Sequence, residues 1–183
     1  RFPKIGIVPP LIQAKVLYNG CTSQSVEMRQ GLPQGSVLSP LLFLFYMDRL
    51  AGILPLTTLN ALFADDVGIL ATARTIKVAE ALAQETVDVV VEWSKKNHLT
   101  LNSTKSEACL FTTNRKEARE SVRISIDGRM IPFNPTPKFL GVFLDRELTF
   151  VKHVTEIAAR CKAKLRMLSA LTHTTWGCLK RDL

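Results

Sequence analysis

The chain has 183 residues, of which 46% are hydrophobic and 22% are charged, so it can form one domain with a hydrophobic core and is neither disordered nor fibrous. Its longest unbroken apolar run covers residues 41–47, far short of the roughly 18 residues of a membrane span, which excludes a transmembrane protein. Lysine and arginine number 24 against 16 aspartate and glutamate, and this net charge of +8 points to a polyanionic partner.

Two short strands open the predicted order of elements, at residues 15–18 and 25–29, on either side of the turn signal Asn19-Gly20. The residues between that signal and the second strand favour a longer loop over a tight hairpin. Residues 40–51 follow as a predicted buried helix, because their apolar run begins with a serine that suits an N-cap and a proline that suits a first turn.

Two apolar runs, at residues 59–63 and 67–71, flank the pair Asp65-Asp66. They predict a strand, a tight turn and a strand, with both carboxylates at the tip of a buried hairpin. Residues 76–96 carry apolar side chains at helical spacing and predict an amphipathic helix.

Three further strands are predicted at residues 108–112, 122–126 and 139–144, and the second of them ends at the turn signal Asp127-Gly128. After residue 149 the sequence places apolar side chains on one helical face and basic side chains largely off it. This pattern predicts an amphipathic helix with a basic flank, and the whole order of elements belongs to the α+β class.

The four cysteines lie far apart without a Cys-x-x-Cys pair, and the three histidines lack zinc-ligand spacing. Reduced, packed thiols and an intracellular location are therefore expected, and no secretory leader opens the sequence. The chain begins with arginine instead of methionine, which suggests a fragment or a processed product.

An acidic island interrupts the basic chain, because residues 51–100 hold four basic and six acidic groups. The adjacent carboxylates of Asp65 and Asp66 repel each other by about 1 kcal/mol at about 4 Å even in water, so a cation nearby would offset the repulsion. Two-metal phosphoryl chemistry uses such a pair, since carboxylates bridge two cations that activate a hydroxyl and stabilise a leaving oxygen. On these residues alone, a solvated turn that uses one carboxylate for local hydrogen bonds is an equal alternative.

A glycine-rich turn before the first helix gives the acidic pair a context. Residues 31–36 read Gly-Leu-Pro-Gln-Gly-Ser, residues 38–43 read Leu-Ser-Pro-Leu-Leu-Phe, and residues 63–66 read Phe-Ala-Asp-Asp. In this order they resemble the palm of reverse transcriptases, and most closely those of non-long-terminal-repeat (LINE-type) retrotransposons. Group II intron maturases have a similar layout but usually carry a tyrosine where this chain has Phe63, so they rank second.

Two later segments extend the resemblance in the same order. Leu-Thr-Leu-Asn at residues 99–102, with Lys105 and Glu107, resembles the fourth palm motif of the family. Phe-Leu-Gly-Val-Phe-Leu-Asp at residues 139–145 resembles its primer-grip motif, and the helix that follows resembles the start of the thumb.

The resemblance implies an α+β fold, with a partial palm at residues 1–148, built as a ferredoxin-like antiparallel sheet with helices on one face, and the thumb beginning at residues 149–183. It implies a fragment of an RNA-directed DNA polymerase that uses two-metal nucleotidyl transfer. Its partners would be an RNA template, a DNA primer and deoxynucleoside triphosphates. Its cofactor would be Mg²⁺, with Mn²⁺ as the alternative, and its place a nuclear or cytoplasmic ribonucleoprotein.

The same resemblance assigns roles to individual residues. They are Asp65 and Asp66 as metal ligands and, with Lys105, as catalytic residues; Gln34, Gly35 and Ser36 at the nucleotide and template; Phe139, Leu140 and Gly141 as the primer grip; and Lys152, Arg160, Lys162, Lys164 and Arg166 on the nucleic-acid backbone. Without the motifs, Lys105 would be read as a solvated lysine and Gly141 as a strand irregularity.

The family's first palm motif, which carries a further metal-binding aspartate, is expected upstream of Arg1 together with the fingers. No acidic residue precedes Glu27, so the N-terminal segment offers no substitute. The isolated chain is therefore expected to be nearly inactive. The alternative function is a catalytically dead relic that acts at most as a basic RNA- or DNA-binding module.

Overall fold

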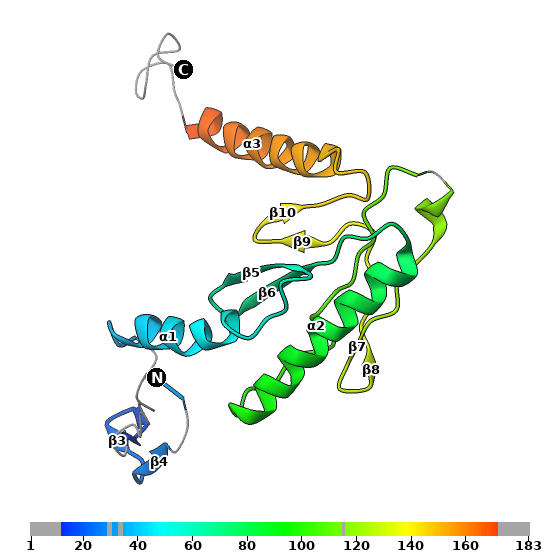
Figure 1. Ribbon diagram of the computed structural model, residues 1–183. Helices are drawn as coiled ribbons and strands as arrows, with labels where there is room; N and C mark the ends of the chain where they lie inside the picture. The colour runs from blue at the N-terminus through cyan, green and yellow to red at the C-terminus, as the bar shows by residue number, and fades with distance from the viewer. Residues whose placement is uncertain (1–11, 29–30, 33–34, 115, 172–183) are drawn as a thin grey trace. The chain divides into compact units, whose positions relative to one another are not determined.

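The computed structural model describes residues 12–171 except residues 29–30, 33–34 and 115 (Figure 1). The chain divides into two compact units, residues 1–49 and 50–183, which are described separately. Within the described residues, every ladder is antiparallel and two-stranded. The mixed α+β class is confirmed, whereas the single ferredoxin-like sheet stays a prediction. None of the helices in the described part of the chain has the length and apolar character to cross a membrane.

Four short strands form a hairpin in the first unit. They are β1 (Ile12–Ala14), β2 (Leu17–Tyr18), β3 (Cys21–Thr22) and β4 (Val26–Met28). Tyr18 pairs with Cys21 across Asn19 and Gly20, whose φ angles of 51° and 79° form the left-handed pair that a type I′ turn needs. The prediction of a longer loop is wrong, because this two-residue turn directly joins β2 to β3, which form a second ladder besides that of β1 and β4.

Helix α1 (Ser39–Ala51) matches the predicted span to within one residue, with Ser39 as its first residue. The prediction of a buried helix is wrong: Leu44 and Phe45 are 51% and 65% exposed, whereas Met47 and Leu50 are buried. The helix itself carries apolar side chains on all of its sides, and the side with Met47 and Leu50 is buried.

The second unit holds the remaining elements. They are β5 (Leu59–Phe63), β6 (Asp66–Leu70), α2 (Ile76–Lys96), the 3-10 turn η1 (Glu117–Arg119), β7 (Ser125–Ile126), β8 (Arg129–Met130), β9 (Lys138–Phe139), β10 (Val142–Phe143) and α3 (Val151–Leu171). Helix α2 has the predicted bounds, because Thr75 caps its start by accepting a hydrogen bond from the Val78 N–H at 3.4 Å.

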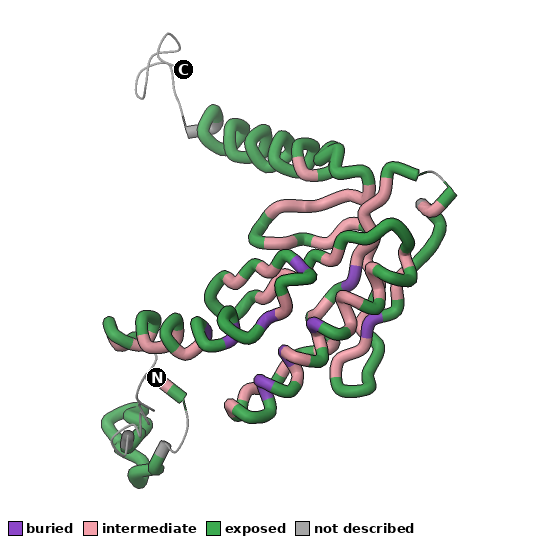
Figure 2. Tube along the Cα trace, viewed as in Figure 1, coloured by how far each residue is buried: buried purple, intermediate pink, exposed green. Residues whose placement is uncertain are grey.

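The core of this unit forms along α2 (Figure 2). Its buried apolar side chains are Leu50, Leu54, Val90, Trp93, Ala108 and Ile124. The hydroxyl of Thr86, which is also buried, lies 3.1 Å from the Thr58 hydroxyl, and it donates to the Leu82 carbonyl at 3.0 Å. The predicted apolar face of α2 is confirmed at Val90 and Trp93.

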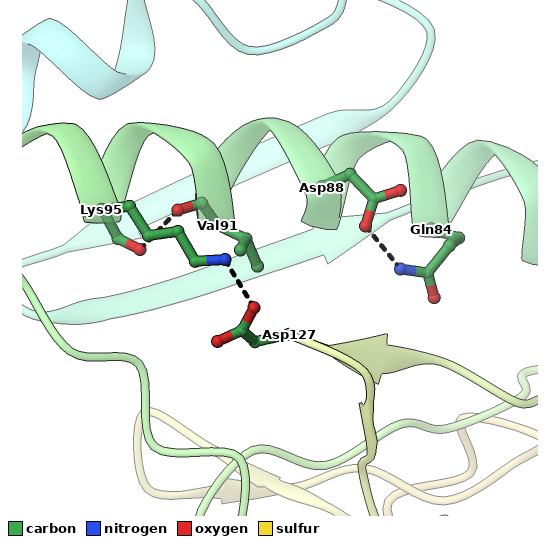
Figure 3. A network of polar contacts seen from close by, with 6 residues as sticks. Gln84, Asp88, Val91, Lys95 and Asp127 are labelled. Carbon is green, nitrogen blue, oxygen red and sulfur yellow. Dashed lines mark hydrogen bonds and ion pairs between the residues drawn. The ribbon is translucent and has the colours of Figure 1, made fainter.

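Polar side chains on α2 hold the segment that contains β7. Lys95 forms an ion pair with Asp127 at 2.5 Å, and the Gln84 amide donates to Asp88 at 2.8 Å (Figure 3). The same Gln84 amide accepts from the Ser125 N–H at 2.8 Å and donates to the Ser125 carbonyl at 2.9 Å. Gln84 therefore pairs with the backbone of β7 as a neighbouring strand would.

This arrangement explains why the predicted strand at residues 122–126 is shorter in the structure. The Arg123 N–H donates to the Glu80 carboxylate at 2.8 Å, so it is not available to a strand ladder. Pairing is therefore confined to β7 and β8, which meet at the predicted turn Asp127-Gly128, where both φ angles are positive.

The predicted strand at residues 108–112 forms no ladder. Ala108 makes one isolated parallel bridge, in which its N–H donates to the Pro132 carbonyl at 3.0 Å and its carbonyl accepts from the Asn134 N–H at 2.8 Å. Thr112 instead donates its N–H to the Arg146 carbonyl at 3.0 Å. The backbone of this extended segment therefore bonds to residues 132–134 at one end and to Arg146 at the other.

The predicted strand at residues 139–144 is a hairpin and not a single strand. Strands β9 and β10 pair across Leu140 and Gly141, whose φ angles are 46° and 88°. Leucine rarely adopts the left-handed region, so the residue pair Leu140-Gly141 is only a weak indication of a turn in the sequence.

Candidate active site

The acidic pair sits at the tip of the β5–β6 hairpin. Phe63 pairs with Asp66, so Ala64 and Asp65 form a two-residue turn, in which Ala64 has a φ angle of 51°. The second strand therefore begins one residue earlier than predicted and includes Asp66. The prediction of a buried hairpin is wrong, because no residue of β5 or β6 is buried. Both aspartates are exposed, and their carboxylates are open to a ligand from solvent.

The donor chemistry of this tip fits a hard divalent cation in part. Mg²⁺ prefers oxygen ligands, and two neighbouring carboxylates supply them. Within the described ranges, no cluster of three or more His, Cys, Asp or Glu side chains is placed to hold a metal ion. Asp65 and Asp66 can therefore supply carboxylate oxygens to such a cation, but within the described residues they do not belong to a larger cluster of metal-ligating side chains.

The β9–β10 hairpin contacts β6, the strand that begins at Asp66. A methyl group added at Gly68 in β6 would lie 2.9 Å from Cζ of Phe139. Asp66 and Gly68 are two positions apart in the strand, so the Asp66 side chain and a Cβ built at Gly68 belong to one face. The structure thus places the predicted grip residue Phe139 on the face of the hairpin to which Asp66 belongs.

The two other predicted grip residues form the turn of this second hairpin. Leu140 and Gly141 are exposed, and a methyl group added at Gly141 would meet no other atom within 4 Å. Phe139 directly precedes this turn in the chain, so the contact of its ring with β6 places the turn near that strand.

Lys105 lies in a turn that Asn102 organises. The side-chain oxygen of Asn102 accepts from the N–H groups of Thr104 at 3.1 Å and Lys105 at 3.2 Å, an arrangement typical of an Asx turn. Lys105 is exposed, and its side chain is open to solvent. Its predicted role at the nucleotide phosphates stays a prediction.

The predicted nucleotide and template residues belong to the first unit. Gln34 lies outside the described residues. Gly35 is exposed and has a φ angle of 88°, a conformation that favours glycine. Ser36 is half-buried, and its carbonyl accepts from the Ser39 N–H at 3.3 Å at the start of α1.

Asp145 fixes the start of α3. Its two carboxylate oxygens accept from the Thr149 N–H at 2.8 Å and the Phe150 N–H at 2.6 Å. The hydrogen bond from Thr149 is the main cause that holds the pKa of Asp145 below the usual value for aspartate. The charged carboxylate therefore stabilises the junction between β10 and α3.

The depressed pKa predicts an acid-sensitive helix start. Stability from Asp145 is fully present above the ordinary aspartate pKa of about 4 and is lost as the pH falls through the lower folded value. Amide exchange should show faster opening at Thr149 and Phe150 under acid, and Asp145→Asn should show that faster opening already at neutral pH. Glu147→Gln, at an exposed neighbour, is the matched control and should leave the exchange unchanged. Equal exchange in Asp145→Asn and the unchanged chain would contradict the assignment.

The residues that are predicted to bind the nucleic-acid backbone lie on α3, which is exposed from Val154 to Ser169 (Figure 2). At helical spacing, Arg160 and Lys164 lie on one side of the apolar stripe, and Lys162 and Arg166 lie on the other. Lys152, in the first turn, donates to the Thr136 hydroxyl at 2.8 Å, and its ammonium lies 4.9 Å from the centre of the Phe143 ring.

Comparison with known proteins identifies the family of the chain. Residues 2–144 match the family described as reverse transcriptase (RNA-dependent DNA polymerase). The RNA-directed DNA polymerase from mobile element jockey of Drosophila melanogaster is 30% identical over 162 residues, which are 85% of this chain and 17% of that protein. No solved structure matches the chain.

Two further relatives agree with this match. The probable RNA-directed DNA polymerase from transposon X-element of Drosophila melanogaster is 33% identical over 169 residues, which are 89% of this chain and 18% of that protein. A retrovirus-related Pol polyprotein from type-1 retrotransposable element R1 2 of Nasonia vitripennis is 27% identical over 152 residues, 80% of this chain and 37% of that protein. The predicted relation to non-long-terminal-repeat retrotransposons is confirmed, and the chain belongs to the reverse transcriptase (RNA-dependent DNA polymerase) family.

Proposed function

We propose that the chain is the palm and thumb-start segment of an RNA-directed DNA polymerase of a retrotransposon. The observation that carries this proposal is the exposed pair Asp65-Asp66 at the two-residue turn of the β5–β6 hairpin, with Phe139 against β6, in a chain of this family. The substrates are a DNA primer, an RNA template and deoxynucleoside triphosphates. The palm is proposed to complete its ferredoxin-like sheet with upstream strands.

The reaction forms a bond between the primer's 3′-oxygen and the α-phosphorus, breaks the bond to pyrophosphate, and releases the proton of the 3′-hydroxyl. Asp65 and Asp66 would hold Mg²⁺ or Mn²⁺, with Asp65 as the firmer ligand. When bound, the cations favour the alkoxide form of the attacking hydroxyl and stabilise the leaving oxygens. Lys105 would bind the nucleotide phosphates, and Phe139, Leu140 and Gly141 would orient the primer end.

Primer extension tests this function. In a swapped polymerase, this chain replaces the matching segment of the jockey polymerase, so that the rest of the relative supplies the other parts. We expect the swapped polymerase to extend a DNA primer on an RNA template when Mg²⁺ and all four deoxynucleoside triphosphates are present. The unmodified jockey polymerase is the positive control. Failure of the swapped polymerase to extend the primer while the control does so would contradict the proposed function.

The second candidate function is nucleic-acid binding without catalysis. The exposed, basic helix α3 favours it, since cationic side chains on an open helix can bind phosphates of any sequence. In this case the chain would bind RNA or DNA in a filter assay, while the swapped polymerase would fail to extend a primer.

Both functions predict that α3 contributes salt-dependent affinity. The double variant Lys162→Gln and Arg166→Gln removes two cations from one side of the helix. It should lower the slope of log affinity against log salt by about two, because each phosphate that is no longer neutralised lowers the slope by about one. Arg74→Gln with Lys77→Gln, at exposed positions near the start of α2, is the charge-matched control. Equal slopes for the two double variants would rule out α3 as the binding helix.

A further inference from the structure

We propose that Gly68 and Phe139 are positioning residues, which together set the distance between the metal-binding hairpin tip and the turn that holds the primer end. The inference rests on the proposed function and adds to it a specific contact between two hairpins. It assigns a role to a glycine in the middle of strand β6, outside every motif that the sequence analysis identified.

The contact leaves no room for a side chain on β6. A methyl group at Gly68 would lie 2.9, 3.3 and 3.5 Å from three atoms at the far edge of the Phe139 ring. The first of these distances is shorter than two carbon atoms tolerate, since their optimal separation is about 3.5–4.0 Å. The aromatic ring therefore lies directly on the strand backbone, and glycine is what permits this approach.

The contact is close to both halves of the proposed site. Gly68 is two residues from Asp66, which corresponds to about 7 Å along a strand. On the other hairpin, Phe139 immediately precedes the turn Leu140-Gly141 and pairs with Val142. A movement of the Phe139 backbone away from β6 would therefore move the turn relative to the carboxylates.

The opposite strand of the grip hairpin is held at its other side, which limits how far the hairpin can move. The Phe143 N–H donates to Nδ1 of His153 at 3.4 Å, at the first turn of α3. The ammonium group of Lys152, also in α3, lies 4.9 Å from the centre of the Phe143 ring. An added methyl group at Gly68 must displace the Phe139 ring. On this proposal, part of that displacement passes to the adjoining turn Leu140-Gly141, because the hairpin is also anchored to α3.

The test is a double-mutant cycle in the swapped polymerase. Gly68→Ala should lower kcat for nucleotide addition by up to about 10²-fold, because a shift of about 1 Å in a reacting group costs that much. The KM for the nucleotide should change little, since the primer end and not the nucleotide is displaced. Phe139→Leu should also lower kcat, because leucine lacks all three ring atoms that contact Gly68.

Rescue separates positioning from general damage. In the double variant, leucine leaves space for the added methyl group, so kcat should recover at least about tenfold from the lower single variant. Ala61→Val is the matched control: Ala61 is exposed and pairs with Gly68 across the ladder, so the change adds bulk to the same face of the neighbouring strand. It should keep kcat near that of the swapped polymerase.

Two results would overturn the inference while leaving the proposed function intact. The first is an active swapped polymerase in which the two losses simply multiply in the double variant. The second is rescue of the melting temperature without rescue of kcat, which would make the contact structural only. Absence of all extension by the swapped polymerase itself would instead overturn the proposed function, and the positioning role would fall with it.

Discussion

Replacing Asp65 with asparagine is expected to remove nearly all Mg²⁺-dependent primer extension by the swapped polymerase. Loss of a residue that merely orients a metal ligand costs about 10- to 100-fold, so loss of a direct carboxylate ligand should lower kcat by more than about 10²-fold. Asparagine keeps the size of the side chain and removes its charge, so the exposed two-residue turn should still form. Steady-state extension at several Mg²⁺ concentrations measures both the rate and the metal requirement.

The controls for this experiment lie in the same unit. Asp66→Asn should cause a smaller loss, because Asp65 is the firmer proposed ligand. Asp88→Asn removes an equal charge from an exposed position on α2, and its remaining amide oxygen can still accept from Gln84. It should leave extension unchanged. Full Mg²⁺-dependent activity in Asp65→Asn would show that this hairpin tip does not carry the chemistry.

The largest expected effect on stability follows replacement of Trp93 with alanine. Trp93 is buried on α2, within a small core, and truncation of a buried aromatic residue costs about 3–5 kcal/mol. That is a large share of the roughly 5–15 kcal/mol that stabilises a typical domain. Urea denaturation, monitored by circular dichroism, should show that Trp93→Ala loses most of its helical signal at a much lower urea concentration than the unchanged chain does.

Val78→Ala is the control for this prediction, since Val78 lies on the same helix and is about half exposed. Its effect should stay within about 0.5 kcal/mol, because exposed positions contribute little packing and alanine favours a helix. A common midpoint for the two variants would mean that α2 does not form the core of this unit.

Local patterns predicted the elements whose hydrogen bonds are local. Helix α2 has the expected bounds because the threonine cap and the 3.6-residue spacing act within the segment itself. The hairpin at residues 59–70 was predicted to within one residue for the same reason: two short apolar runs meet at a turn. In both cases the side chains that determine the structure lie within a few positions of one another.

Elements that depend on distant partners were predicted less well. The strand expected at residues 122–126 is short because the side chains of Glu80 and Gln84, about forty positions away, take its backbone N–H groups. The exposure of α1 could not be read from its composition, because its apolar side chains surround the helix and do not define one face. Such contacts leave no local signature.

The candidate site shows the same division. The acidic pair and the grip motif were identified as residues, but the contact that brings the two hairpins together was not. One signal was present, since an isolated glycine within a strand pattern indicates a close backbone approach, and Gly68 is such a glycine. Sequence alone did not reveal which residue approaches it, because Phe139 lies 71 positions later.

The length of α3 gives its anchored end a mechanical role. With 21 residues the helix is about 30 Å long. Asp145 accepts hydrogen bonds from the two residues directly before the helix, and His153 anchors its first turn. Because the helix is long, a rotation of about 10° at its base would carry its far end through about 5 Å, close to one helical pitch. A small change in the hydrogen bonds of Asp145 would thus shift the exposed far end of α3 much further than its base.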